Sequence, residues 1–264
     1  MLNKTLVSRP YAFRNFMDGD SFTQNDHTAL ASLKSKFILS AGLTVEEIRD
    51  LFRTLLRSST AVSGFSRLRD MVAGLSVDAR NADFSGIASL CSALAALLKD
   101  QIVNATILTA SEQRTITQSI DLISDLCDHE QDNQDKIVKH PLILAIDDDL
   151  NARKTMVHSL RRIEYTPVVT GDCQIALKLL EENRFDLVLL DVLMPEMNGF
   201  DLIQHIRDRE MNKSTPVIFV TGLADFNSRV KSLAAGGADF IAKPFHHLEL
   251  AVKAETLLLR RALR

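Results

Sequence analysis

Hydrophobic positions follow different periods in the two halves of this chain. From about residue 29 to 128, apolar residues recur every three or four positions, the spacing of one face of an α-helix. After Pro141, short apolar runs alternate with helical stretches, which is typical of strands and helices in alternation. We therefore expect an all-α domain followed by an α/β domain.

The first half is predicted to be a bundle of four or five helices. Thr44, followed three residues later by Glu47, predicts a capping box that opens a new helix. Proline is absent between Tyr11 and His140, which favours antiparallel helices joined by short loops. The apolar stripes that define these helices are Leu30–Ile38, Val45–Leu56, Phe65–Leu75, Ile87–Leu98 and Ile116–Leu126.

Two polar segments flank the predicted bundle. Residues 1–28 are rich in turn residues and have no clear period, so we expect an extended arm. Residues 129–140 offer little apolar surface to bury and are predicted to be a linker. The expected order is an arm (1–28), a helical bundle (29–128), a linker (129–140) and an α/β domain (141–264).

Composition narrows the environment and the partners. With 264 residues, the chain is long enough for two domains, and its net charge of -3 gives no strong field for nucleic acid or an anionic membrane. Cys91, Cys127 and Cys173 lack metal-ligand spacing, which indicates buried thiols in a reducing compartment. No run approaches the roughly 18 apolar residues of a membrane span. We expect a cytoplasmic protein that binds neither nucleic acid nor a membrane.

Five short apolar strands are predicted in the second half. Because helical patterns separate them, the strands should form a parallel sheet covered on both faces, with right-handed crossovers. The predicted strands are Leu142–Ile146, Pro167–Thr170, Leu187–Leu190, Val217–Val220 and Phe240–Ala242.

Chemically capable residues stand where these strands end, at the edge where open α/β sheets bind ligands. Asp147 and Asp148 follow the first strand, Asp191 the third, Thr221 the fourth and Lys243 the fifth. Crowded carboxylates repel one another, and a hard divalent cation such as Mg²⁺ relieves the repulsion. A carboxylate beside a metal and a lysine could attack a phosphoryl group. The alternative for Asp191 is that it only caps the following helix.

Four motifs carry a resemblance to a known family. They are Ile143–Asp149, Leu190–Gly199, Val217–Gly222 and Gly237–Phe245, in that order. Together they resemble the receiver domains of two-component response regulators, over about Pro141 to Arg264. The resemblance implies a flavodoxin-like fold, with a five-stranded parallel sheet in the order 2-1-3-4-5.

The resemblance also implies roles for individual residues. The implied roles are phosphoacceptor for Asp191, Mg²⁺ ligands for Asp147, Asp148, Asp191 and the backbone carbonyl of Leu193, switch residues for Thr221 and Phe240, and phosphoryl-pairing lysine for Lys243. The alternative for Thr221 is a turn residue and the alternative for Phe240 is a core residue, and Asp149 is expected to cap a helix. Lys243-Pro244 would usually be a cis peptide in this family.

The bundle carries a fainter resemblance, to histidine phosphotransfer domains. Around Leu68–Leu75, Gly74 matches that family, but Asp70 stands at the histidine position and Ala73 at the usual lysine position. This resemblance implies a fold that is kept and a chemistry that is lost. The alternative is an unrelated helical domain for docking or dimerisation.

The expected function is that of a response regulator. A sensor histidine kinase or a phosphotransfer protein would phosphorylate Asp191, and the bundle would act on an unknown protein target or a second copy of the chain. No DNA-binding or enzymatic output segment follows the predicted last helix, Leu248–Arg264, so no enzyme activity is expected beyond self-phosphorylation and self-dephosphorylation. Leu193 and Leu223 would slow hydrolysis. The alternatives are a phosphorelay intermediate and a constitutive scaffold.

Overall fold

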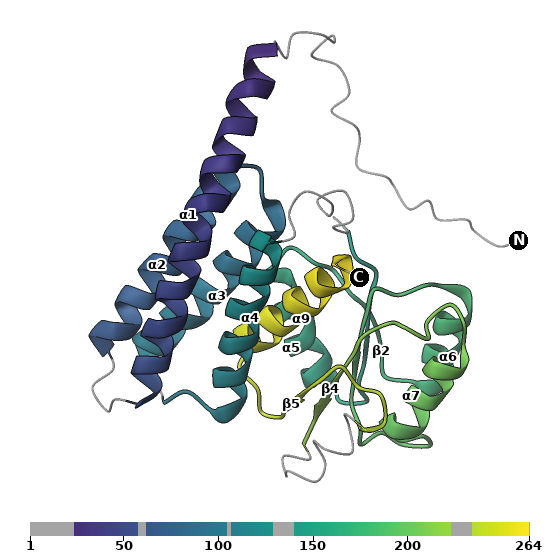
Figure 1. Cartoon of the computed structure of the whole chain (residues 1–264). Helices are drawn as coiled ribbons and strands as arrows, with labels where there is room; N and C mark the ends of the chain where they lie inside the picture. Colours follow the sequence, from purple (N-terminus) through teal and green to yellow (C-terminus); the bar gives the residue numbers. More distant parts are fainter. Residues whose placement is uncertain (1–23, 58–61, 105–106, 129–139, 223–233, 264) are drawn as a thin grey trace, which may run out of the picture.

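The structure is a computed structural model that describes residues 24–57, 62–104, 107–128, 140–222 and 234–263. These residues form a helical bundle and an α/β domain that lie side by side (Figure 1). The sequence prediction of an all-α part followed by an α/β part is confirmed.

Four helices form the bundle within the described residues. Each buries an apolar stripe, and the central helix supplies Leu90, Leu94, Leu97 and Leu98, which have no exposed surface. The helices are α1 (Gln24–Arg57), α2 (Val62–Asn81), α3 (Ser85–Asn104) and α4 (Ala110–Asp128).

The start of the bundle differs from the prediction. Helix α1 begins at Gln24, so the expectation of an extended arm is wrong for residues 24–28, while residues 1–23 lie outside the described part. The capping box at Thr44 is also wrong, because its hydroxyl donates to the carbonyl of Ser40 inside a continuous helix. The buried positions Ala41 and Val45 keep the helical spacing across Gly42, so one stripe runs through both predicted helices.

The α/β domain contains a single parallel sheet in the order β2-β1-β3-β4-β5, as predicted. All residues of β1 and β3 are buried, because side chains alternate between two covered faces. The strands are β1 (Ile143–Ile146), β2 (Val168–Thr170), β3 (Leu187–Leu190), β4 (Val217–Thr221) and β5 (Asp239–Ala242).

Helices cover both faces of the sheet. Leu144 and Leu190 face a core shared with α6 (Cys173–Glu182) and α7 (Gly199–Asp208). Ile143 and Leu189 face the other core, shared with α5 (Leu150–Arg161) and α9 (His247–Ala262). The strand ends that carry Asp191 and Lys243 therefore emerge from a sheet held on both sides.

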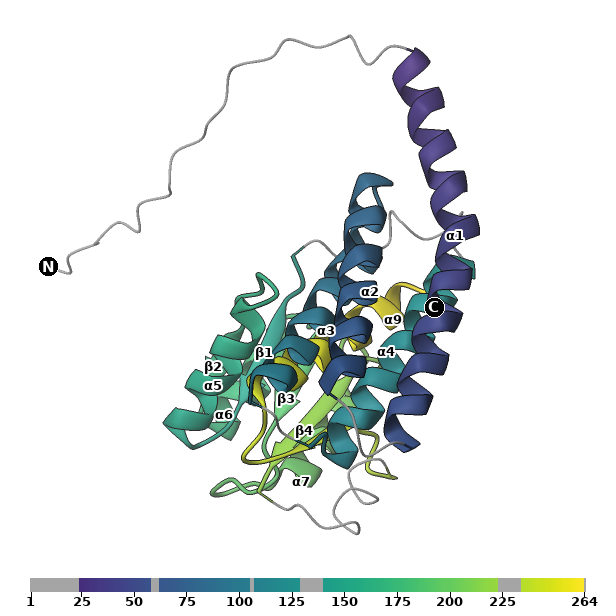
Figure 2. The ribbon, with the colours of Figure 1, turned by 90° about the vertical axis from the view of Figure 1, so that its left-hand side faces the viewer.

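Helix α9 belongs to both parts of the molecule. Leu248 and Val252 pack into the bundle core, whereas Leu250 and Ala254 pack against the sheet. Figures 1 and 2 show α9 between the sheet and helices α3 and α4. The bundle therefore rests on the last helix of the α/β domain. The predicted linker cannot be compared, since residues 129–139 lie outside the described part.

Helix α3 is the most apolar helix of the bundle by mean hydropathy. By length and composition it could cross a membrane, although the sequence was expected to contain no such segment, and it is the one described helix that passes this test. In the structure 56% of its apolar window is buried. A core helix of a bundle has the same composition, so the observation is weak evidence for a membrane span.

Candidate functional site

Asp191 stands at the carboxyl end of β3, with both carboxylate oxygens engaged. Oδ1 accepts hydrogen bonds from the backbone N–H groups of Val192 at 2.7 Å and Leu193 at 3.3 Å. Oδ2 accepts from the Lys243 ammonium at 2.8 Å. Asp191 does not cap the next helix, since Asn198 is the N-cap of α7. Asp191 is thus 4% exposed, and its carboxylate is fixed in orientation.

The turn after Asp191 requires glycine at position 199. A Cβ atom there would lie 2.2 Å from the Asp191 carbonyl oxygen and 2.9 Å from the Val192 Cα. Gly199 N–H also donates to the Val192 carbonyl at 2.9 Å. The start of α7 therefore packs directly on the backbone that presents the Asp191 side chain.

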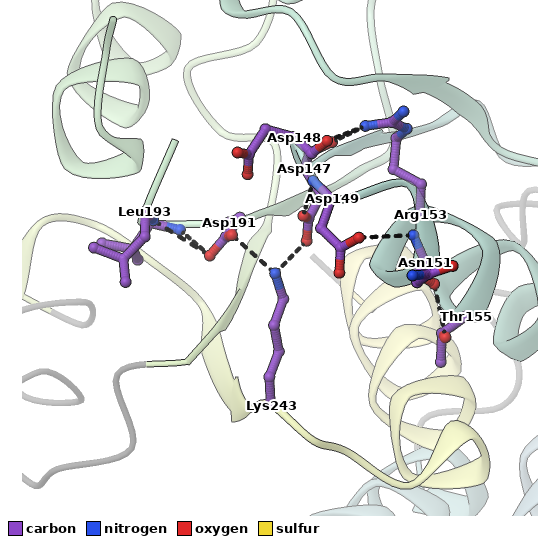
Figure 3. A network of polar contacts seen from close by, with 10 residues as sticks. Asp147, Asp148, Asp149, Asn151, Arg153, Thr155, Asp191, Leu193 and Lys243 are labelled. Atoms are coloured by element: carbon purple, nitrogen blue, oxygen red, sulfur yellow. Dashed lines mark hydrogen bonds and ion pairs between the residues drawn. The ribbon is translucent and has the colours of Figure 1, made fainter. Parts of the chain in front are cut away.

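Three carboxylates converge at this edge of the sheet. Ligand oxygens of Asp147, Asp148 and Asp191 all lie within 4.8 Å of one another. Asp147 is completely buried, whereas Asp148 is exposed. Figure 3 shows the Lys243 ammonium between Asp147 and Asp191. The cluster is therefore anchored in the protein on one side and open to solvent on the other.

Lys243 joins two of these carboxylates. Its ammonium lies 2.6 Å from Asp147 Oδ2 and 2.8 Å from Asp191 Oδ2, and it precedes a cis peptide bond to Pro244. Burial lowers the pKa of Lys243, but hydrogen bonds and charges from both aspartates outweigh burial and raise it. Burial raises the pKa of Asp147, and Lys243 offsets only part of this effect.

This donor set fits Mg²⁺. Three carboxylates face one ammonium, which leaves an excess of negative charge, and all the available donors are hard oxygen atoms. Among the residues that the structure describes, no other group of acidic, histidine or cysteine side chains gathers in this way. Asp147, Asp148 and Asp191 are thus the residues suited to hold a divalent cation.

The remaining predicted residues lie at the same edge or just behind it. Thr221 ends β4, is completely buried, and accepts the Lys243 N–H on its carbonyl at 2.8 Å. Phe240 is 6% exposed and packs in the core on the α6 and α7 side. Leu193 is 55% exposed, and Leu223 lies outside the described residues. The switch and metal-carbonyl roles stay predictions.

Arg153 supports the site and was missed by sequence reasoning. Its guanidinium donates to the backbone carbonyls of Asp147 and, at 2.9 Å, Asp148. Asp149 caps α5 by accepting from Asn151 N–H at 2.9 Å, as expected, and so fixes the turn in which Arg153 stands. The one sequence signal for Arg153 was its position four residues after the helix cap Asp149. That signal was not sufficient, because the sequence does not show whether an arginine contacts backbone carbonyls or solvent.

Comparison with known families gives one match, to the response regulator receiver domain, over residues 143–255. Similar curated proteins include the probable transcriptional regulator ycf27 of Guillardia theta, 33% identical over 118 residues that cover 45% of each chain. The phosphate regulon transcriptional regulatory protein PhoB of Escherichia coli K12 is 30% identical over 118 residues, 45% of this chain and 52% of that protein. The chain spans about half the length of these relatives or less.

Other relatives differ in what surrounds the matched region. The 3',5'-cyclic-nucleotide phosphodiesterase regA of Dictyostelium discoideum is 35% identical over 119 residues, 44% of this chain and 15% of that protein. Among solved structures, a putative response regulator from Chloroflexus aurantiacus is 28% identical, with a TM-score of 0.44 over 46% of this chain and 98% of its own. The receiver domain of sensor histidine kinase PA1611 from Pseudomonas aeruginosa, solved with magnesium, is 26% identical, with a TM-score of 0.42 over 47% and 99%.

Proposed function

Residues 143–255 form a two-component response regulator receiver domain, and from this premise we propose that the chain accepts a phosphoryl group on Asp191 and signals through its helical bundle. The observation that supports this most directly is the contact between Asp191 Oδ2 and the Lys243 ammonium at 2.8 Å. Carboxylate oxygens of Asp147 and Asp148 lie within 4.8 Å of a carboxylate oxygen of Asp191.

The proposed reaction is transfer from a phosphohistidine of a sensor histidine kinase or a phosphotransfer protein. A carboxylate oxygen of Asp191 forms a bond to phosphorus while the phosphorus–nitrogen bond of the donor breaks, and the departing imidazole nitrogen takes up a proton. Lys243 neutralises charge on the phosphoryl oxygens, because its ammonium already lies against Asp191. The N–H groups of Val192 and Leu193 keep the carboxylate aimed at the donor.

The acidic cluster supplies the place for a cation in this proposal. Asp147, Asp148 and Asp191 would hold Mg²⁺ together with the backbone carbonyl of Leu193. Bound there, the cation would neutralise negative charge on the phosphoryl group. Arg153 keeps the Asp147–Asp148 backbone in position through its two carbonyl contacts.

Helix α9 offers a physical route from Asp191 to the bundle. The Lys243 N–H donates to the Thr221 carbonyl, so the ends of β4 and β5 move together. Phosphorylation gives Lys243 and Thr221 new oxygen partners, and α9 begins four residues after Lys243, at His247. At the other end of β5, Lys253 of α9 pairs with Asp239 at 2.7 Å, so α9 is tied to this strand at both ends. A shift at these strand ends is therefore passed to α9.

Buried hydrogen bonds connect α9 to helix α4 of the bundle. The Glu249 carboxylate accepts from Ser111 at 2.5 Å and from Thr115 at 3.2 Å, both on α4. Nearby, Ser119 and Thr256 hydroxyls lie 3.2 Å apart. Hydrogen bonds are directional, so a small rotation of α9 weakens them and changes the surface that α4 presents. Output through protein contacts follows from this arrangement.

The test is phosphoryl incorporation from radiolabelled acetyl phosphate, with and without Mg²⁺. The wild-type chain should be labelled in a Mg²⁺-dependent and hydroxylamine-labile manner, as an acyl phosphate is. Asp191→Asn should abolish the label, whereas Asp208→Asn, at an exposed aspartate ending α7, should retain it. Labelling of Asp191→Asn at the wild-type level would remove Asp191 from this role.

The phosphorelay alternative needs an accepting histidine on the bundle. Residues 29–128 contain none, and Asp70, at the position discussed above, is exposed and paired with Arg69. No observation therefore favours that alternative.

A further inference from the structure

A cavity lies at the end of the sheet opposite Asp191. Pro216 and Ala238, which line it, come directly before β4 and β5, whereas Asp191 and Lys243 follow the carboxyl ends of their strands. Its volume is about 570 Å³, which falls in the range of small-molecule sites. Nothing in the proposed phosphoryl chemistry uses this cavity.

The lining of the cavity is strongly basic. Arg207, Lys213, Arg260 and Arg261 line it, and no acidic residue of the described chain does. Arg261 pairs with Asp186 at 3.1 Å, but the other three basic groups have no carboxylate partner among the described residues. The whole chain carries a net charge of -3, so this local excess of positive charge does not reflect its composition.

Arg207 is held in the wall by carbonyl groups. Its Nη1 donates to the carbonyls of Lys213 at 3.1 Å and Thr215 at 2.9 Å, and its Nη2 donates to that of Gly236 at 2.6 Å. Burial lowers the pKa of Arg207. Carbonyl oxygens satisfy its hydrogen bonds without cancelling its charge, so an anion in the cavity would supply the missing compensation.

Two further positively charged side chains, Lys213 and Arg260, are placed to bind such an anion. Lys213 lies exposed in the turn between α7 and β4, and Arg260 lies half-buried in the last turn of α9. Neither side chain has a hydrogen bond or ion pair within the described part of the chain. Arginine guanidinium and lysine ammonium groups are common ligands of phosphate oxygens.

Part of the cavity lining is apolar. Leu257 of α9 lines it together with Pro216 and Ala238, and Ser214 adds a hydroxyl at the edge. A water molecule occupies about 30 Å³, and an inorganic phosphate is only a few times larger. A single phosphate would therefore leave most of the cavity volume of about 570 Å³ unfilled. The lining thus combines several positive charges with apolar side chains.

We propose that this cavity binds a nucleoside polyphosphate. Its phosphates would lie against Lys213 and Arg260, with Arg207 adding positive potential, and its base would pack on Leu257 and Pro216. Because Leu257 and Arg260 belong to α9, the ligand would contact the same helix that carries the bundle. The site stands on its own cavity and charges, so it does not depend on Asp191 as phosphoacceptor.

Isothermal titration calorimetry of the full chain tests the proposal with ATP, GTP, adenosine and inorganic phosphate. The buffer contains EDTA and about 150 mM salt, because salt at this concentration screens non-specific attraction between exposed charges. ATP or GTP should bind with a stoichiometry of one per chain. Its affinity for a Lys213→Ala, Arg260→Ala double variant should be at least tenfold lower. Lys154→Ala, at an exposed lysine of α5, is the matched control and should bind as the wild type does. Asp191→Asn should also bind normally.

Adenosine alone should not bind, because it lacks the charges that the cavity would recognise. The single variant Lys213→Ala, at an exposed turn, should weaken binding several-fold and serves if the double variant does not fold. Absence of binding by both triphosphates at millimolar concentration would overturn the proposal, as would binding that the double variant leaves unchanged. Equal affinity for inorganic phosphate and ATP would also overturn it, because the cavity would then select only an anion.

Discussion

The shared helix α9 allows the two domains to be loosened one at a time. Leu248 and Leu250 are two residues apart on α9 and face opposite sides, Leu248 into the bundle core and Leu250 against the sheet. Both are buried, with 4% and 0% of their surface exposed. Replacing either by alanine costs about 2–5 kcal/mol. A loss of about 3 kcal/mol raises the population of an opened state on the order of 100-fold.

Three buried cysteines report where the opening occurs. Cys91 and Cys127 lie in the bundle, whereas Cys173 begins α6 of the receiver domain. In Leu248→Ala, alkylation of Cys91 and Cys127 should accelerate on the order of 100-fold while Cys173 stays near its wild-type rate. Mass spectrometry of the alkylated peptides after timed quenching measures each rate separately.

Leu250→Ala is the matched control, because the same substitution on the sheet-facing side of α9 should leave Cys91 and Cys127 nearer to their wild-type rates than Leu248→Ala does. The reasoning fails if Leu248→Ala accelerates all three cysteines equally. In that case the two cores would open as one cooperative unit, and the two domains could not be loosened one at a time through α9.

Three further predictions concern single positions. Burial raises the pKa of Glu255, whose Oε2 has no partner among the described residues, so its carboxyl group stabilises the fold below its ordinary pKa and loses this contribution as pH rises through the folded-state value. Glu255→Gln should therefore raise the unfolding free energy by about 1–3 kcal/mol at pH 8 and change it little near pH 4; urea unfolding that shows the same difference at both pH values would contradict this. Lys243→Ala should lower the initial rate of phosphoryl incorporation from acetyl phosphate by about 10²–10³-fold, because it removes the cation at Asp191; a rate within twofold of wild type would exclude that role. Gly199→Ala should displace the Asp191 backbone, since its Cβ would lie 2.2 Å from that carbonyl, and reduce labelling while circular dichroism still shows a folded chain; unchanged labelling would show that the turn adapts freely.

The candidate site could be predicted because each buried strand ends at a polar residue. In a parallel sheet these ends share one edge, so Asp147, Asp191 and Lys243 could be placed together from sequence alone. The contacts between Lys243 and both carboxylates fulfil that geometric expectation. Their chemical roles were inferred from the resemblance and stay proposals.

Features that depend on packing between distant segments could not be predicted. The break expected at Thr44 came from the capping-box pattern of Thr44 and Glu47, but tertiary burial of Ala41 and Val45 carries the helix across it. The two-sided burial of α9 was also missed, because a helical period shows that a face is buried without identifying its neighbour. The basic cavity likewise joins Lys213 and Arg260 from separate elements.

The most direct measurement locates the phosphoryl group on the chain. The wild-type protein is treated with acetyl phosphate and Mg²⁺, digested, and mapped by tandem mass spectrometry. The account predicts one phosphoryl group, on Asp191, that is absent when Mg²⁺ is removed by chelation. A phosphoryl group on another residue, or equal phosphorylation of Asp191 without a divalent cation, would contradict it.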